Sequence, residues 1–334
     1  AFVYALTERL DASSLLDSIE ATYFAFRRRL RDIRQATTCT CNACRLIPAL
    51  DLKVVAHHGV VIRQRVAGRE ELVGSDVVLV HRLLKNDVAE SGGPAAYALL
   101  TAACLEAAGV DPDRLGVVEH LESFEGVGEV RAFVHDLGAA WERELAATRV
   151  VVSLKDALVV TRRLPVEPPV AWEYVTAPSE RTRWQQGVTA VVEDLPDGSG
   201  RRGVGTTNHC MHGEAAVVEE VLDWRPFEYL TVRSTLPYPG APKVRTTITL
   251  DAVDDGTDVS FRVERPRSAK LREAMAPVAE GYVAGVHASF DALTARLAAE
   301  HVGDPKAEAG QATEARQMGD LGPTRDAPTT VSRP

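Results

Sequence analysis

The sequence predicts an α+β protein with two folded domains. At 334 residues the chain is long enough for about two domains. Helix-like and strand-like segments alternate over about the first 120 residues, whereas after residue 150 a series of strand-like runs ends in one long helical pattern. Hydrophobic residues make up 45% of the chain, which is enough for ordinary buried cores.

Charge and composition exclude several kinds of partner. The net charge of −9 and the pI near 5.6 argue against nucleic acid or an anionic membrane as a main partner, because both attract basic surfaces. No apolar run approaches the roughly 18 residues of a transmembrane helix, and no signal peptide is visible, so we expect a cytoplasmic protein without membrane insertion.

The segment from about residue 11 to residue 35 predicts an amphipathic helix. Asp11 or Ser13 can cap its start. One buried face follows from apolar residues spaced three or four apart, namely Leu16, Ile19, Tyr23, Phe26, Leu30 and Ile33. Before this helix, residues 1–6 (AFVYAL) predict an apolar strand.

Three cysteines follow the helix closely. Cys39, Cys41 and Cys44 are soft ligands within six residues, so they could hold a zinc ion with His57 or His58 as a fourth ligand. The spacing differs from the usual C-x-x-C knuckle, and no second pair follows. A redox-sensitive thiol cluster and a merely tolerated loop are the alternatives.

Residues 52–86 predict a β-hairpin that leads into a helix. Two β-branched runs, Val54–Ala56 and Val60–Val66, are joined through Gly59. An acidic turn at residues 69–71 and a helical pattern after Gly74 follow. His57 and His58 would point to opposite faces of a strand, so one is expected in the core and the other could face a ligand or metal.

The motifs CxCxxC, LDLK, AHHG, ELVG and VHRLLKN resemble a cyclase-like family of unassigned function. More broadly, this stretch resembles the second half of a class III adenylate/guanylate cyclase domain, over about the first 120 residues. The resemblance implies a truncated cyclase-like α/β sandwich that lacks the strand and hairpin carrying the two metal-binding aspartates. It also implies a homodimer, because such cyclases form their sites between two domains.

The resemblance assigns roles to only part of a cyclase site. It places Glu71 at the purine-reading position and Arg82 at the position of the arginine that stabilises charge on the phosphate. Val78 occupies the position of the ribose-binding asparagine and cannot hydrogen-bond a ribose. The alternative for Arg82 is a salt bridge on a helix surface.

The middle of the chain predicts helices and a linker. Pro94 suits a first helical turn, and residues 97–107 form an Ala-rich helical pattern that Gly109 ends. Residues 110–149 contain acidic, helix-like segments. We therefore expect a cyclase-like domain over residues 1–120, a helical linker over 121–149, a second domain over 150–300 and a disordered tail over 301–334.

The second domain predicts a largely antiparallel sheet. A strand over residues 150–164 is followed by a helix that begins near Pro168. Six strand-like runs come next, and DDGTD between the last two is a strong hairpin signal. The runs cover residues 188–194, 203–210, 214–223, 227–236, 243–252 and 257–264. A helix over about residues 268–300 closes the domain.

This order of elements, with the SERTRWQQG segment, resembles the START-like (SRPBCC) helix-grip superfamily of polyketide cyclases and lipid-binding proteins. The resemblance implies a curved antiparallel sheet around a long C-terminal helix, with a cavity for a hydrophobic ligand between them. The candidate ligand-binding residues are Trp184, His209, Tyr238, Arg245, Tyr282 and His287.

Several of these candidates have simpler explanations. Trp184 could anchor the core, and Tyr282 lies on the apolar stripe of the last helix. His209 and His212 are three residues apart, so at most one of them points inward from a strand.

These patterns favour a regulatory or small-molecule-binding protein. In this interpretation a degenerate cyclase-like domain accompanies a START-like domain that holds a hydrophobic ligand. The alternatives are an active class III nucleotide cyclase in the full-length chain, and a polyketide cyclase/aromatase in which His209, Arg245 and Tyr282 act. No catalytic residue is assigned with the first interpretation.

Overall fold

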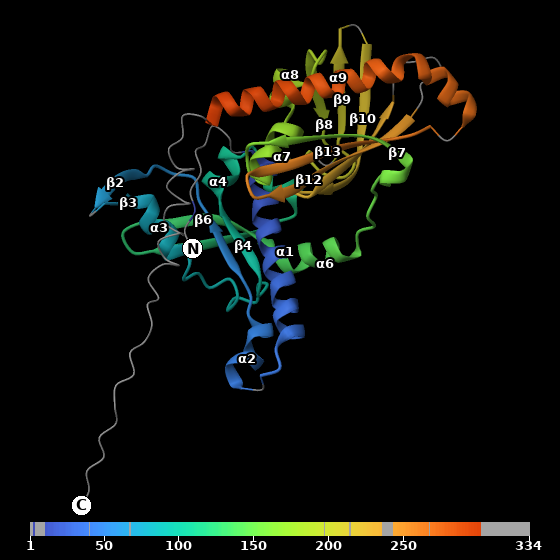
Figure 1. Cartoon of the computed structure of the whole chain (residues 1–334). Helices are drawn as coiled ribbons and strands as arrows, with labels where there is room; N and C mark the ends of the chain where they lie inside the picture. Colours follow the sequence, from blue (N-terminus) through green and yellow to red (C-terminus); the bar gives the residue numbers. More distant parts are fainter. Residues whose placement is uncertain are drawn as a thin grey trace, which may run out of the picture.

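The computed structural model describes residue 3 and residues 11–39, 41–66, 68–196, 198–213, 215–235, 243–266 and 268–301. The fold is α+β, with a four-stranded sheet, a seven-stranded sheet and a separate two-stranded hairpin (Figure 1). Within these ranges no helix is both long and apolar enough to cross a bilayer. The predicted strand over residues 1–6, apart from Val3, and the predicted tail from residue 302 lie outside the described residues.

The first helix, α1 (Ala12–Ala36), has the predicted extent and a well-formed start. The Asp11 side chain accepts a hydrogen bond from the Ser14 backbone N–H at 2.7 Å, and the Asp11 N–H donates to Ser14 Oγ at 3.0 Å. This reciprocal pair is a capping box, which satisfies donors that a helix start otherwise leaves unpaired. The buried face includes Leu16, Ile19, Tyr23 and Leu30.

The four-stranded sheet has the order β1-β4-β6-β5. Its strands are β1 (Lys53–Ala56), β4 (Tyr97–Thr101), β5 (Val118–Phe124) and β6 (Gly128–Asp136). β1 and β4 are parallel, and the other two pairings are antiparallel. Leu105, Phe133, Leu137 and Trp141 join the α1 face in one hydrophobic cluster, so α1 covers this sheet.

Two predictions for this region are wrong. Within the helix predicted over residues 97–107, only α4 (Ala102–Ala107) is helical, because β4 is a central strand with all five residues buried. A strand buried on both faces has no alternation to distinguish it from a buried helix. The predicted helical linker over 121–149 contains most of β5 and β6, and only α6 (Leu137–Ala146) is helical.

The predicted hairpin through Gly59 is also wrong, because β1 pairs with β4. The hairpin instead joins β2 (Ile62–Val66) to β3 (Arg69–Val73), so the predicted acidic turn is a strand. Gly68 lies in the turn between β2 and β3 with a φ of 82°, which glycine adopts without strain. The helix predicted after Gly74 is present as α3 (Ser75–Leu83).

Short helices complete the N-terminal half. α2 (Asn42–Leu46) continues into the 3₁₀ turn η2 (Ile47–Ala49), and α5 (Pro112–Leu115) precedes β5. In the C-terminal half, η3 (Leu154–Asp156) comes before the first strand, so the strand predicted from residue 150 starts only at residue 157.

The seven-stranded sheet is antiparallel throughout, in the order β7-β13-β12-β11-β10-β9-β8. After β7 (Ala157–Leu164), the helices α7 (Pro168–Thr176) and α8 (Pro178–Trp184) intervene before the remaining strands. These strands are β8 (Ala190–Asp194), β9 (Thr207–His212), β10 (Ala215–Arg225), β11 (Tyr229–Thr235), β12 (Lys243–Val253) and β13 (Gly256–Glu264).

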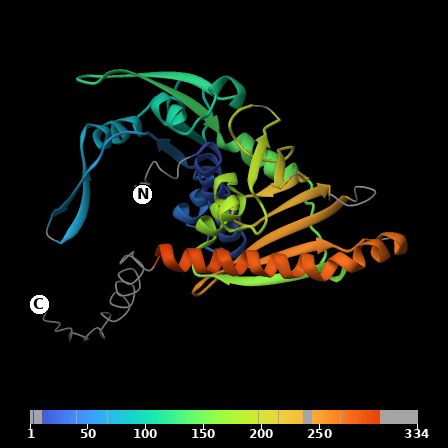
Figure 2. The ribbon, with the colours of Figure 1, turned by 90° about the horizontal axis from the view of Figure 1, so that it is seen from above.

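The long helix α9 (Ala269–His301) runs along this sheet, which confirms the helix-grip arrangement (Figure 2). Phe290, Leu293 and Leu297 on α9 are at most 2% exposed and share one cluster with buried residues of the sheet. Trp184 at the end of α8 stacks on Phe290, with ring centroids 5.8 Å apart. The C-terminal half of α9 is therefore packed against the sheet, as expected for the apolar face of an amphipathic helix.

Candidate ligand-binding cavity

A cavity of about 330 Å³ lies between the seven-stranded sheet and the helices α7, α8 and α9. Strands β10, β11 and β12 contribute every second residue, because alternate side chains of a strand face the same side. The lining residues that follow this alternation are Val217, Glu219, Val221, Leu230, Val232, Ser234, Thr246 and Ile248. Trp224 on β10 also lines the cavity, after a register shift between Val221 and Asp223.

Much of the cavity wall is apolar or aromatic. Trp184, Trp224, Phe261 and Tyr282 line it together with the aliphatic residues of the central strands. Trp184 is fixed by a hydrogen bond from its Nε1 to the Tyr174 carbonyl at 2.8 Å. Trp224 meets the ring of Trp172 edge-on, with centroids 4.8 Å apart. Such a wall suits a largely apolar molecule.

A buried ion pair marks the polar end of the cavity. Arg181 on α8 donates to Glu219 Oε2 at 2.8 Å, and their side chains are 10% and 15% exposed. Arg181 also donates to Gln185 Oε1 at 3.1 Å and reaches Cys210 Sγ at 3.4 Å. Burial raises the pKa of Cys210 to about 12 despite the nearby guanidinium. Cys210 is therefore a neutral thiol rather than a nucleophilic thiolate near neutral pH.

Three buried polar atoms at this end have no hydrogen-bond partner among the described residues: Glu193 Oε1, Arg202 Nε and Asn208 Oδ1. All three residues line the cavity. Glu193 and Asn208 are register partners on β8 and β9, and Arg202 Nε lies 4.0 Å from Glu193 Oε1. Burial raises the pKa of Glu193. Unpaired buried polar atoms are costly, so this group is suited to a polar atom of a bound molecule or water.

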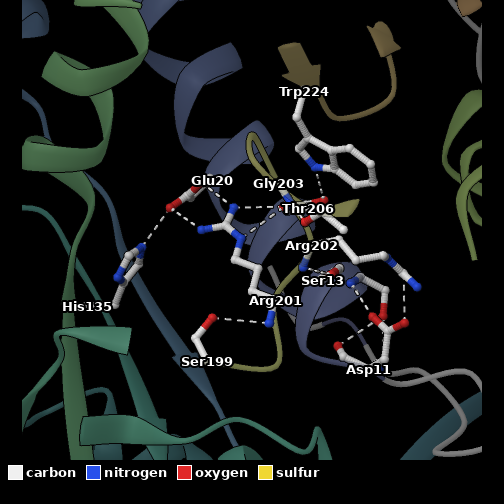
Figure 3. Close-up of polar contacts among 12 residues, drawn as sticks. Asp11, Ser13, Glu20, His135, Ser199, Arg201, Arg202, Gly203, Thr206 and Trp224 are labelled. Carbon is white, nitrogen blue, oxygen red and sulfur yellow. Dashed lines mark hydrogen bonds and ion pairs between the residues drawn. The ribbon is translucent and has the colours of Figure 1, made fainter. Parts of the chain in front are cut away.

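Hydrogen bonds and ion pairs connect the wall of the cavity to α1 in the N-terminal half (Figure 3). The Trp224 Nε1 donates to Asp17 Oδ2 at 2.9 Å. Arg201 reaches Asp17 Oδ1 at 2.7 Å and Glu20 Oε2 at 2.6 Å, and Glu20 Oε1 lies 2.8 Å from His135 Nε2. These contacts form one continuous polar network, called here the α1 network, from the cavity wall to β6.

Burial and neighbouring charges shift the pKa values of the α1 network in opposite directions. Burial raises the pKa of Asp17, whose side chain is fully buried, although Arg201 opposes the shift. Burial alone would also raise the pKa of Glu20, but Arg201 and His135 hold it well below its ordinary value. The two carboxylates in turn raise the pKa of Arg201, despite its burial. Arg201 is therefore the cation that compensates both acids.

Arg202 also connects the loop before β9 to the start of α1. Arg202 donates from its backbone N–H to Ser13 Oγ at 2.7 Å and from Nη2 to Asp11 Oδ2 at 2.8 Å. Nearby, Gly200 has a φ of 88°, and a Cβ there would lie 2.4 Å from the Gly109 carbonyl oxygen. Glycine is thus required where the two halves approach each other closely.

Only some of the predicted ligand-binding residues line the cavity. Trp184 and Tyr282 do. His209 does not, because Asn208 and His212 are on the side of β9 that faces the cavity, and His209 alternates with them. Of the two histidines, His212 is therefore the one that lines this cavity.

The other predicted residues lie elsewhere. Arg245 makes a bidentate ion pair with Glu264, with N–O distances of 2.7 and 2.9 Å, and neither residue lines the cavity. Arg162 Nη2 lies 2.6 Å from His287 Nδ1, and neither lines it. Tyr238 lies outside the described residues. Sequence reasoning missed Arg181, Glu193, Arg202 and Asn208, although Arg181 belongs to the SERTRWQQG segment.

The predicted cyclase-type residues are spread over α3 and the hairpin. Glu71 is exposed on β3 opposite Gln64. Val78 is 51% exposed on α3. Arg82 Nη1 donates to the Glu125 backbone carbonyl at 2.6 Å, so this hydrogen bond is to the backbone of the β5–β6 turn and is not a salt bridge.

The predicted metal ligands separate into two places. The Sγ atoms of Cys39, Cys41 and Cys44 all lie within 4.8 Å of one another. His57 does not belong to this group. Its Nδ1 lies 2.9 Å from Thr101 Oγ1 and its Nε2 lies 3.5 Å from Asp76 Oδ1. His57 follows the end of β1, so the strand-face argument for His57 and His58 does not apply.

Two protein families match different parts of the chain. Residues 155–301 match the family described as Polyketide cyclase / dehydrase and lipid transport, which supports the resemblance of the C-terminal half. Residues 1–92 match a family described as Protein of unknown function (DUF2652). The resemblance of the N-terminal half to class III cyclases is not confirmed and stays a prediction.

Individual relatives cover parts of the chain. An uncharacterized protein of Mycobacterium tuberculosis is 36% identical over 118 residues, which are 34% of this chain and 52% of the relative. The chain thus spans about half the length of this curated relative. A solved structure from Mesorhizobium loti is 20% identical and covers 41% of this chain and 96% of its own, with a TM-score of 0.33. One from Rhodobacter sphaeroides is 17% identical and covers 46% and 99%, with a TM-score of 0.37.

Proposed function

We propose that the C-terminal half binds a small, mostly apolar molecule that carries one neutral hydrogen-bonding group, such as a hydroxyl. The observation that carries this proposal is the cavity itself, which has an apolar wall and three unpaired polar atoms at one end. Its volume of about 330 Å³ is near the lower end of ligand pockets, which span roughly 300–1,000 Å³.

The charges at the polar end favour a neutral group over a carboxylate. Arg181 is already paired with Glu219, and Arg202 is paired with Asp11 and lies near Glu193. No surplus positive charge therefore remains among these residues to compensate an anion. A ligand anion would also be buried next to two carboxylates, which costs free energy.

A hydroxyl can pair with two of the three unpaired atoms, one acceptor and the donor. Asn208 Oδ1 and Glu193 Oε1 are acceptors, and Arg202 Nε is a donor. A hydroxyl can donate to one of these acceptors while it accepts from Arg202. An apolar molecule without such a group would leave all three atoms unpaired, unless water stays with it.

The test is native mass spectrometry of the full chain with matched ligand pairs, in which small hydroxylated aromatic compounds are compared with their analogues lacking the hydroxyl. We expect the hydroxylated member to bind roughly five- to tenfold more tightly, since a hydrogen bond contributes about 1 kcal/mol. Val232→Phe should abolish binding by filling the cavity. The matched control is His209→Phe, which places the same ring on the other face of the sheet. Equal binding by wild type and Val232→Phe would refute the proposal.

We further propose that the N-terminal half is regulatory and senses this cavity through the α1 network. The support is the direct bond between Trp224, a cavity residue, and Asp17 on α1. The structured N-terminal half would then extend through α6, beyond the predicted boundary at residue 120. Homodimerisation of this half stays a prediction, which light scattering of the purified protein would test.

The catalytic alternatives gain less support. Of His209, Arg245 and Tyr282, the predicted residues of a polyketide cyclase, only Tyr282 lines the cavity. Tyr282 also packs with Val244 and Val263, so a structural role accounts for its position as well.

A further inference from the structure

We propose that Cys39, Cys41 and Cys44 form a three-thiolate site for a soft divalent metal ion, with zinc as the physiological candidate. This site is independent of the cavity and of its proposed ligand. Each cysteine offers one sulfur, the three sulfurs lie within 4.8 Å of one another, and none of the three is in a disulfide.

The fold brings the sulfurs together before any metal is bound. Cys41 is the residue that precedes α2, and Cys44 lies one turn further along the helix. The Arg45 N–H donates to the Cys41 carbonyl at 3.1 Å, which closes the turn that carries both side chains. Cys39 approaches from the preceding loop, so a short segment supplies all three ligands.

The distances suit zinc after a small adjustment. Zinc–sulfur bonds of about 2.3 Å at tetrahedral angles place the sulfurs about 3.8 Å apart. The observed limit of 4.8 Å therefore requires the sulfurs to move by about 1 Å or less. Cys39 and Cys41 are exposed and Cys44 is partly exposed, so rotation of these side chains meets little packing resistance.

Metals bind the thiolate form of cysteine, so binding of a divalent ion would displace three thiol protons and leave one net negative charge on the complex. The exposure of these cysteines separates them from Cys104 and Cys210, which are both buried.

The fourth coordination position is open to an outside ligand. No other described histidine, cysteine or carboxylate joins the three sulfurs within 4.8 Å. Water, a small thiol or a donor from a binding partner would complete the tetrahedron. This arrangement differs from a structural four-ligand site and suits a metal ion that exchanges.

The test is zinc titration of the reduced, metal-free full chain against a competing chelator, followed by thiol alkylation and mass analysis. We expect one zinc ion per chain and zinc-dependent protection of Cys39, Cys41 and Cys44 from alkylation. Each of Cys39→Ser, Cys41→Ser and Cys44→Ser should weaken zinc binding at least about tenfold, since even the loss of an outer partner of a metal ligand costs 10- to 100-fold.

The matched control is Asn42→Ser, which introduces the same side chain between the cysteines and should bind zinc like wild type. All four substitutions are at surface positions, so circular dichroism should show an unchanged fold. Zinc affinity that is equal in the wild type and the three cysteine variants would overturn the site, as would the absence of any stoichiometric binding to the reduced wild type.

Discussion

Trp224 and Asp17, which are 207 residues apart in the sequence, share a hydrogen bond of 2.9 Å between Nε1 and Oδ2. Trp224 lines the cavity, and Asp17 is a fully buried residue of α1 whose other oxygen binds Arg201. A wall of the candidate ligand site is therefore bonded to a charged network in the other half of the chain. A ligand that displaced Trp224 would therefore lengthen or break its hydrogen bond to Asp17.

The first prediction concerns the strength of this bond. A double-mutant cycle of Trp224→Phe and Asp17→Asn should give an interaction energy of about 1.5–3 kcal/mol, as for a hydrogen bond to a charged group. The measurement is chemical unfolding of the wild type, the two single variants and the double variant. An interaction energy near zero would mean that the two halves are not coupled through this contact.

The second prediction concerns Arg201. Arg201→Met removes the cation that compensates Asp17 and Glu20, so it should destabilise the protein by about 3–5 kcal/mol. The matched control is Arg183→Met, since Arg183 is 54% exposed and pairs with Glu180 on the surface of α8. We expect a change of less than about 0.5 kcal/mol for this control. Equal effects of the two substitutions in urea unfolding would contradict the role of Arg201.

The third prediction concerns acid pH. The pKa of Glu20 is lowered in the folded state, so its stabilising charge is fully present above its unfolded pKa of about 4.3 and is lost as the pH falls toward the folded value. The difference in unfolding free energy between wild type and Glu20→Gln should therefore be constant just above pH 5 and shrink below about pH 4. A difference that grows on acidification would have the wrong sign.

The fourth prediction separates stability from binding at the polar end of the cavity. Asn208→Leu removes a buried acceptor that has no partner among the described residues, so the ligand-free protein should lose little stability or gain some. The same substitution should reduce the preference for hydroxylated ligands over their analogues. Thermal unfolding and titration calorimetry measure the two effects. His209→Leu, on the opposite face of β9, should leave the ligand preference unchanged.

The elements of this fold were predictable where the signal is local. The spacing of apolar residues in α1 and in α9, and the turn chemistry of DDGTD between β12 and β13, depend on neighbours within a few residues. The predicted boundaries of these helices and of the β12–β13 turn agree with the structure to within about two residues. The order of elements in the second half was therefore enough to identify the helix-grip fold.

Predictions that depended on the position of a segment in a sheet were less successful. β4 has the composition of a buried helix, and only its pairing between β1 and β6 makes it a strand. Similarly, the choice between His209 and His212 depends on which face of β9 turns toward α9, which the alternation of residues alone does not decide.

The helix-grip order, the cluster of three cysteines and the acidic character of the chain are readable from the amino-acid sequence, because each is a property of composition or of short spacing. The polar groups that line the cavity and the contacts that join the two halves became evident only from the three-dimensional packing. Arg201 meets Asp17 across 184 residues, and Asn208, Glu193 and Arg202 meet at a cavity that no single segment contains. Burial changes the energetic weight of these groups, and burial follows from packing between distant segments.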